Sequence, residues 1–416
     1  MTGRSAFPAE GREQAELVRE MSDRTGQDID WRGGRTPLYV FKGSESAAEI
    51  GKAAFMQFFT ENALGGKRAF LSIGGMEREV IDMGLDLFHA PGGAEGHMTT
   101  GGSESIFMAV KAARDAHRAG GSKVGEQLNM VLPESAHPAF DKAARSMEIE
   151  VRRVSLADDR RADPATMRAA ADGRTMMLVA SAPCFPFGVI DPVQAVSDLA
   201  VDLGVWLHVD ACVGGYLIPF ARDNGEPLPA FDFEIAGVRS ISADLHKYGF
   251  CPKPASTLFF RDADDMTRAS FDLDVWANGR FVTHTIAGTR PGGAVAAAWA
   301  VLNHLGRDGY RAIAHDLLAN ARAYREGIEK VQGFHMFAEP DLTILNFGAR
   351  NVDIFAVADR MADRGWLPGR TQDPRGMHLM LSMFHEPARE AYLEALATAA
   401  DEVRRQGAGS DSAAEY

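Results

Sequence analysis

The stretch RTMMLVASAPCFPFGVIDPVQAVSDLAVDLGVWLHVDACVGG, residues 174–215, indicates the fold of the chain. It contains an apolar strand that ends at a proline, a helix that ends at Gly204 and a second apolar strand that ends near Asp210. Similar strands occur in NMVLPESAHPAF, EIEVRRVSL, VRSISADLHK and ASTLFFRD. Strands that alternate with helices are typical of βαβ units. We therefore predict an α/β fold with a central, mostly parallel sheet flanked by helices, and a ligand beyond the carboxyl ends of the strands.

The pattern changes on both sides of this region. Residues 1–60 are interpreted as an N-terminal arm and a helix, and residues 61–290 as the large domain. A long helical pattern begins near residue 291, so residues 291–405 are expected to form a smaller α+β domain at the C-terminal end. The polar residues 406–416 are expected to form a flexible tail.

Composition narrows the classes of function. The 416 residues are 46% hydrophobic, which is enough for a large core. The formal net charge is −13, with 57 acidic and 44 basic residues, which argues against nucleic acid or an anionic membrane as the partner. Three cysteines do not make a disulfide framework, and no apolar run has the length of a secretion signal or membrane span. We expect a cytoplasmic protein without a membrane anchor.

One lysine stands in an unusual place. In SISADLHKYGFCPKPAST, residues 240–257, Lys247 follows an apolar run and precedes a loop broken by prolines. A lysine at the edge of a cleft is suited to react as a free amine, for example with a carbonyl group. Considered alone, however, a solvated lysine at a strand end is the better interpretation.

A second group comes before a helix, in MTTGGSESIFMAVKAARDAHR. Gly101 and Gly102 allow the backbone to approach a ligand closely, and the free N–H groups of the first helical turn, with the Ser103 hydroxyl, can hold a phosphate. The spacing matches neither a dinucleotide fingerprint nor a P-loop. An ordinary helix start is the alternative that this motif alone leaves open.

Two further positions lie near strand ends. Asp210 ends a nearly all-apolar strand, where a carboxylate is costly unless it is paired. His208 and Cys212 share its face; we interpret His208 as a satisfied core residue, because a third metal ligand is not evident, and Cys212 as a small residue beside a ligand. His137 follows another strand in a loop, where it can stack on an aromatic ligand or simply cap a helix.

One cofactor, pyridoxal 5'-phosphate, explains these groups together. Its aldehyde forms a Schiff base with a lysine, and an aspartate pairs with its pyridinium nitrogen. Lys247 and Asp210 fit these roles. The Gly-Ser helix start fits the phosphate, and His137 can lie over the ring.

The chain also resembles a known family. The segments TTGGSESIFMAVKAARD, SAHPAFDKAA, GVRSISADLHKYGFCPKPAST and TIAGTRPGGAVAAAWAVLNHLGRDGY are similar to those of sphingosine-1-phosphate lyases. The resemblance extends from about Met98 to Tyr310 and more loosely to about residue 400. It implies a fold-type-I homodimer with an active site shared between subunits, and relatives among the pyridoxal-phosphate amino-acid decarboxylases.

The resemblance also implies roles for individual residues. Lys247 would carry the cofactor, Asp210 would pair with the ring nitrogen, and His137 would stack on the ring. Lys253 would act near the substrate as a second catalytic lysine. The remaining residues expected at the cofactor are Gly101, Gly102, Ser103, Cys212, Ser242, His246 and Gly292, and those expected at the substrate are Asn62, Tyr39 and Lys253.

The sequence departs from the family pattern at several positions. In NALGGKRAF, Asn62 is present, but a glycine replaces the histidine that helps to hold the substrate phosphate in the family. Two alternatives stay open for Lys67 and Arg68: one of them takes over the anion from that histidine, or both are ordinary solvated charges. Phe187 stands where the family has Tyr or His, and Pro254 where it has Gly.

We therefore expect an aldehyde-lyase that cleaves the Cα–Cβ bond of a phosphorylated β-hydroxy amine, giving an aldehyde and phosphoethanolamine. The alternative is an amino-acid decarboxylase on the same scaffold, for which Arg290 is a weak candidate to bind the substrate carboxylate. A protein that holds the cofactor without catalysis is a third possibility, which the full set of Lys247, Asp210 and His137 disfavours.

Overall fold

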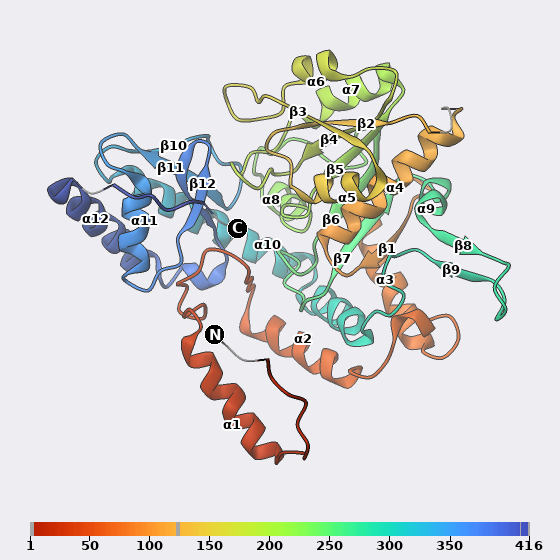
Figure 1. Cartoon of the computed structure of the whole chain (residues 1–416), viewed down its shortest axis with the longest axis horizontal. Coiled ribbons are helices and arrows are strands. Elements are labelled where there is room, and N and C mark those ends of the chain that lie inside the picture. Colours follow the sequence, from red (N-terminus) through yellow and green to blue (C-terminus); the bar gives the residue numbers. More distant parts are fainter. Residues whose placement is uncertain (1–3, 122–124, 408, 415–416) are drawn as a thin grey trace.

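A seven-stranded sheet forms the centre of the chain in the computed structural model, which describes residues 4–121, 125–407 and 409–414 (Figure 1). The strand order is β1-β7-β6-β5-β4-β2-β3. Only β7 runs antiparallel to its neighbours, β1 and β6, so the prediction of a mostly parallel sheet is confirmed. The strands are β1 (Glu95–Thr99), β2 (Asn129–Pro133), β3 (Glu150–Val154), β4 (Thr175–Ser181), β5 (Trp206–Asp210), β6 (Val238–Ala243) and β7 (Ser256–Phe260).

The central strands are continuous apolar runs because both faces of the sheet are covered. In β4, Leu178 and Ala180 pack into one apolar cluster, whereas Met177 and Val179 pack into a second cluster on the opposite face. Gly204, which follows α7, has a left-handed backbone (φ +66°), as expected for a helix that stops at glycine. The helices are α3 (Leu71–Leu87), α4 (Gly102–Ala119), α5 (Ala139–Met147), α6 (Pro164–Ala170), α7 (Val193–Leu203), α8 (Ile218–Asp223) and α9 (Ala263–Ala269).

Two elements extend away from the central sheet (Figure 1). The first is α1 (Gln14–Arg24), which has no buried residue and precedes α2 (Glu45–Gln57). The second is the hairpin of β8 (Phe271–Leu273) and β9 (Phe281–Thr283), whose tip exposes Val275 and Trp276. Within the part of the chain that the structure describes, no helix is long and apolar enough to cross a bilayer.

A smaller unit lies beside the large one, and α10 (Gly292–Glu329), which consists of two helical segments joined by a kink at Gly306 (φ +56°), connects them (Figure 1). The boundary predicted at residue 291 falls at the start of α10, whereas the buried clusters divide within it, after Leu318 and before Ala321. Residues 409–414 of the predicted flexible tail bond to this unit through Ser410 and Ser412. The unit contains the antiparallel strands β10 (Phe334–Met336), β11 (Ile344–Ala349), β13 (Arg375–Met380) and β12 (Gly369–Gln372), with α11 (Ile354–Ala362) and α12 (Arg389–Gln406).

Gly188 belongs to the large unit and lies against β11 of the smaller unit, and this close contact leads to a prediction. It has φ +70°, and an added Cβ would collide with the backbone of Ile344 in β11. Gly204 has a similar φ but open space around its added Cβ. We expect Gly204→Ala to lower the free energy of unfolding by about 1–2 kcal/mol, through backbone strain alone. Gly188→Ala should cost about 1–3 kcal/mol more because of the collision. Urea midpoints of the two variants test this, and equal midpoints would contradict it.

Candidate active site

The carboxyl ends of β4, β5 and β6 meet at a cavity of about 540 Å³. Parallel strands bring residues from distant parts of the chain to this one edge. Its walls combine the start of α4 with the loops that follow the strands. The lining residues with polar side chains are Thr100, Ser103, Glu104, His137, Ser181, Asp210, Cys212, Asp244, His246, Lys247 and Lys253.

The centre of the cavity is an ion pair. Lys247 Nζ lies 2.9 Å from Asp244 Oδ2, and the Asp244 side chain is 2% exposed. Burial lowers the pKa of the Lys247 ammonium, but the Asp244 carboxylate outweighs burial and raises this pKa above its usual value. Conversely, burial raises the pKa of Asp244, and Lys247 outweighs it, so the carboxyl pKa is low. Asp244 Oδ1 is buried without a hydrogen-bond partner among the described residues.

The start of α4 forms a second wall. A Cβ added at Gly102 would lie 2.8 Å from Cys212 Sγ and 3.0 Å from each Asp244 oxygen, so only glycine fits there. Glu104 reaches back past the helix start and accepts hydrogen bonds from Thr100 N (2.7 Å) and Thr100 Oγ1 (2.8 Å). The first N–H groups of a helix have no intrahelical acceptor. Because the Glu104 carboxylate accepts from Thr100, which precedes the helix, it does not occupy the N–H groups of Gly102 and Ser103, and these stay available to a ligand.

Asp210 lies at the floor of the cavity and is held from below. Its Oδ1 accepts from Cys212 N (3.1 Å) and Ser242 Oγ (3.3 Å). Ser242 does not line the cavity; it pairs in register with Asp210 and supports it from the next strand. His208 is a core residue with both ring nitrogens near hydroxyls, Ser240 Oγ at 2.8 Å and Ser242 Oγ at 3.1 Å. Cys212 lines the cavity, and burial raises the pKa of its thiol.

Two histidines flank Lys247 in the cavity. The ring of His137 accepts at Nδ1 from Ala139 N (3.1 Å), which leaves its proton on Nε2 when the ring is neutral. His246 Nδ1 lies 2.6 Å from the Ala255 carbonyl oxygen, so Nδ1 is the donor and carries the proton. Burial lowers the pKa of both rings, which keeps them neutral near pH 7.

Lys253 lies at the border between two cavities. It lines the cavity of Lys247 and also a neighbouring cavity of about 670 Å³, one wall of which is formed by α2. Its Nζ donates to the backbone carbonyl of Tyr39 (2.8 Å), and Tyr39 itself lines neither cavity. Burial, followed by the charge of Lys247, lowers the pKa of Lys253.

Other predicted site residues lie outside the cavity of their own chain. Asn62 accepts from Leu64 N (3.0 Å) and Arg290 N (3.3 Å), and Gly292 N donates to Glu61 O (2.7 Å) at the same junction. Phe187 is buried in a small apolar cluster with Cys184 and Val189. Arg290 forms a two-pronged ion pair with Glu77, and Lys67 lines the same separate cavity as Arg290.

Two acidic residues of the site were assigned no role from the sequence. Asp244 stands three residues before Lys247, a spacing that brings both side chains together once the chain turns after β6. Glu104 bonds Thr100 with one oxygen and, with the other, Ala287 N (2.9 Å), which lies in the loop before α10. The Asp244 spacing was a usable signal, whereas nothing in the sequence indicates the contact between Glu104 and Ala287.

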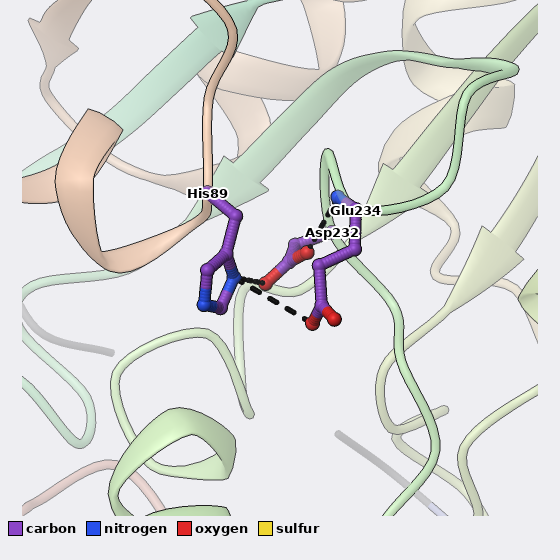
Figure 2. Close-up of side chains that lie close together, drawn as sticks. All are labelled: His89, Asp232 and Glu234. Carbon is purple, nitrogen blue, oxygen red and sulfur yellow. Dashed lines mark hydrogen bonds and ion pairs between the residues drawn. The ribbon is translucent and has the colours of Figure 1, made fainter.

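One cluster of possible metal ligands lies elsewhere (Figure 2). His89 Nδ1 is 3.0 Å from Asp232 Oδ2 and 3.5 Å from Glu234 Oε1, and these are the only three such residues grouped within the described part of the chain. Arg222 also pairs with Glu234. The cluster therefore joins the end of α3 to the segment before β6 through ion pairs. This segment lies at the amino end of β6, whereas the cavity lies at its carboxyl end.

Comparisons with known proteins agree with this geometry. The model of the pyridoxal-dependent decarboxylase conserved domain matches residues 72–350. A sphingosine-1-phosphate lyase of Oryza sativa is 36% identical over 94% of this chain and 73% of its own length. A protein of Pyrococcus furiosus named "Probable L-aspartate decarboxylase" is 35% identical over 86% of this chain and 94% of its own length. The solved structure of a Burkholderia pseudomallei sphingosine-1-phosphate lyase has a TM-score of 0.91 and 33% identity, covering 97% of this chain and 94% of that one.

The ion pair of Lys247 predicts a pH dependence. Because Asp244 raises the pKa of Lys247, the neutral amine forms only at high pH in the protein without cofactor. Asp244→Asn should move the pH of half-maximal Lys247 reactivity downward. Asp210→Asn, which removes a smaller contribution, should move it less. Reductive methylation of Lys247 by formaldehyde, followed by mass spectrometry across a pH series, measures this, and an unshifted profile in Asp244→Asn would refute the assignment.

Proposed function

Because this chain belongs to the sphingosine-1-phosphate lyase family of pyridoxal-phosphate-dependent lyases, we propose that it cleaves the Cα–Cβ bond of a phosphorylated β-hydroxy amine to an aldehyde and phosphoethanolamine. The substrate class is that of sphingosine-1-phosphate or a shorter analogue. The observation that carries this proposal is the cavity in which Lys247, Asp210, His137 and the start of α4 lie together with Lys253.

The residues of the cavity fit pyridoxal 5'-phosphate. Gly102 leaves the space that a Cβ would fill, next to helix N–H groups that suit a phosphate. Ser103 and His246 line the same side, and we assign them with Gly101 and Gly102 to the cofactor phosphate. We assign Asp210, with Cys212 nearby, as the acidic partner for a ring nitrogen, and His137, which also lines the cavity, as the flat ring that stacks on the cofactor.

Pyridoxal phosphate, when bound, takes up a primary amine through its aldehyde and accepts the electron pair of the breaking Cα bond. Lys247 supplies the anchoring amine and, once free, holds a proton at Nζ that it can return to Cα. Ser242 and the backbone N–H of Cys212 hold the Asp210 carboxylate in position through hydrogen bonds to Oδ1.

The charges at the rim favour a phosphorylated substrate. Lys253 is a cation on the cavity wall, and among the residues that the structure describes no arginine lines this cavity. A lysine holds a phosphate as a point charge, whereas carboxylate substrates are commonly held by a two-pronged arginine. Arg290, the candidate for that role, is paired with Glu77 in another cavity. We therefore assign Lys253 to the substrate phosphate.

A decarboxylase is the second candidate. The similarity to the archaeal protein named as an aspartate decarboxylase supports it, as does Gly65, which stands where the family has a phosphate-binding histidine. In this case Lys253 would hold the side-chain carboxylate of an acidic amino acid, and carbon dioxide would leave in place of an aldehyde.

We also propose a homodimer with shared sites, acting in the reducing cytoplasm. Gly292, expected at the cofactor, lies outside the cavity of its own chain, as do Asn62 and Tyr39, which are expected at the substrate. A second copy would give these residues a ligand to contact. The exposed Leu17, Val18 and Met21 of α1 offer apolar surface for such a partner. Cys184, Cys212 and Cys251 are buried free thiols, which suits a reducing compartment.

The product distinguishes the two candidate functions. Purified holoenzyme should release a long-chain aldehyde from sphingosine-1-phosphate and no carbon dioxide from aspartate or glutamate. Lys247→Ala should reduce turnover by about 10⁴-fold or more, because it removes the anchoring amine. Lys253→Met should raise KM more than it lowers kcat, because a ground-state charge contact is lost. Aldehyde and carbon dioxide are measured in parallel; carbon dioxide without aldehyde would establish the decarboxylase instead.

The subunit arrangement has its own test. Light scattering of the holoenzyme should give about twice the 45.0 kDa of one chain. Replacing Leu17, Val18 and Met21 together by serine should shift the protein toward the monomer and lower activity with it. A monomeric protein that retains full turnover would contradict the shared site.

A further inference from the structure

Glu104 joins two parts of the structure that are far apart in the sequence. It is the third residue of α4, and it lines the cavity of Lys247. One carboxylate oxygen accepts from Thr100 N and Thr100 Oγ1, just before the helix, at 2.7 and 2.8 Å. The other oxygen accepts from Ala287 N at 2.9 Å. Ala287 lies in the loop of residues 284–291, which leads from β9 to α10 and which we call the β9–α10 loop.

The bond to Ala287 holds the middle of the β9–α10 loop. The end of the loop is held separately, by the ion pair of Arg290 with Glu77. Within the described part of the chain, no other hydrogen bond joins residues 286–288 to an element outside the loop. The position of the middle of the loop therefore depends on Glu104.

The chemistry of Glu104 suits this position. A carboxylate offers two oxygens with about four lone pairs and no hydrogen, so it can accept all three bonds. A glutamine amide of the same size has one accepting oxygen, and its NH₂ group would face the N–H of Thr100 or of Ala287. The bonds to Thr100 resemble those of an ordinary helix start. Helix formation does not account for the bond to Ala287.

The same helical turn carries the N–H groups that we assign to the cofactor phosphate. Glu104 N and Ser105 N donate to Gly101 O, at 3.0 and 3.1 Å, so these two groups are used. The N–H groups of Gly102 and Ser103 have no backbone acceptor within the described residues. A phosphate held by these groups would fix the first turn of α4, and with it the carboxylate of the next residue.

We propose that Glu104 is a positioning residue that couples the cofactor-phosphate site to the β9–α10 loop. A phosphate at α4 orders the helix start, and Glu104 passes this order to Ala287. By linkage, an ordered loop strengthens cofactor binding by the same factor. The loop leads directly to Gly292, which is expected at a cofactor. The coupling rests on the proposed assignment of the start of α4 to the phosphate, and it is independent of which substrate bond is cleaved.

Hydrogen exchange of the loop, measured by mass spectrometry, tests the coupling with two matched ligands. Pyridoxal 5'-phosphate and pyridoxal carry the same aldehyde, but pyridoxal has no phosphate to place at α4. When each saturates Lys247, pyridoxal 5'-phosphate should slow exchange at the Ala287 amide at least about fivefold, and pyridoxal should leave it nearly unchanged. Equal slowing by both ligands, or slowing by neither, would overturn the coupling.

Glu104→Gln separates coupling from a purely structural bond. In this variant the Ala287 amide should exchange quickly with and without pyridoxal 5'-phosphate. A purely structural bond would raise exchange by the same factor in both forms, and an unchanged ratio between them would contradict the proposal. Glu148→Gln removes the same charge from an exposed residue after α5 whose side chain has no partner within the described residues, and it should keep the wild-type ratio.

Ala287→Pro removes the donor and keeps the charge of Glu104. This charge also repels a phosphate at the same helix start, so Glu104→Gln changes cofactor affinity in two opposing ways. Loss of the bond alone should raise the Kd of pyridoxal 5'-phosphate about fivefold. Ile286→Pro places the same ring one residue earlier, where the N–H has no acceptor within the described residues, and should leave the Kd near the wild-type value. Equal Kd values in the two proline variants would refute the coupling.

A wrong assignment of the phosphate site gives a different result. Equal affinities for pyridoxal 5'-phosphate and pyridoxal would overturn the assignment and the coupling together. Unequal affinities with equal exchange at Ala287 would overturn the coupling alone. The aldehyde assay of the proposed reaction is separate from both measurements.

Discussion

A charged amine held inside a protein needs a fixed counter-charge, and the Lys247–Asp244 pair meets this need at the ends of the parallel strands. Much of the surrounding structure follows from that pair. Asp244, together with Cys212, leaves no room for a side chain at position 102, so the first residue of α4 is a glycine. Glu104 then bonds Thr100 instead of the helix start itself, and the first N–H groups of α4 stay open toward the same space. A cation, a carboxylate and a helix start thus share one cavity.

The sequence was sufficient for the sheet and for the principal groups of the cavity. Lys247, Asp210 and His137 were identified because one cofactor explains all three together and because their segments resemble those of the family; each lies at or shortly after the end of a strand, and such ends meet in a parallel sheet. The absence of a third metal ligand at a suitable spacing also indicated that His208 belongs to the core, and Ser240 and Ser242 lie within hydrogen-bond distance of both of its ring nitrogens. These conclusions depend on short-range patterns that the chain carries in full.

Other features depend on contacts between distant segments, which local patterns do not encode. Ser242 was expected at the cofactor, but the register of β5 and β6 places it beside Asp210, where it donates a hydrogen bond to that carboxylate. Asn62 accepts a hydrogen bond from the backbone of Arg290, and Gly292 donates one to the carbonyl of Glu61. Both bonds connect residues more than 200 positions apart and lie away from the cavity. The bond between Glu104 and Ala287 gave no signal, because it depends on how the loop after β9 lies against the start of α4.

The bond between Lys253 and the Tyr39 carbonyl gives the proposed substrate site an internal competitor. A ligand must offer Lys253 a better acceptor than a backbone carbonyl before the lysine turns toward it. A phosphate dianion does so, because charge-assisted hydrogen bonds are about twice as strong as neutral ones, whereas a hydroxyl group does not. Selectivity for a charged head group would then come from the resting state of the protein, in which the weaker ligand loses to the chain itself.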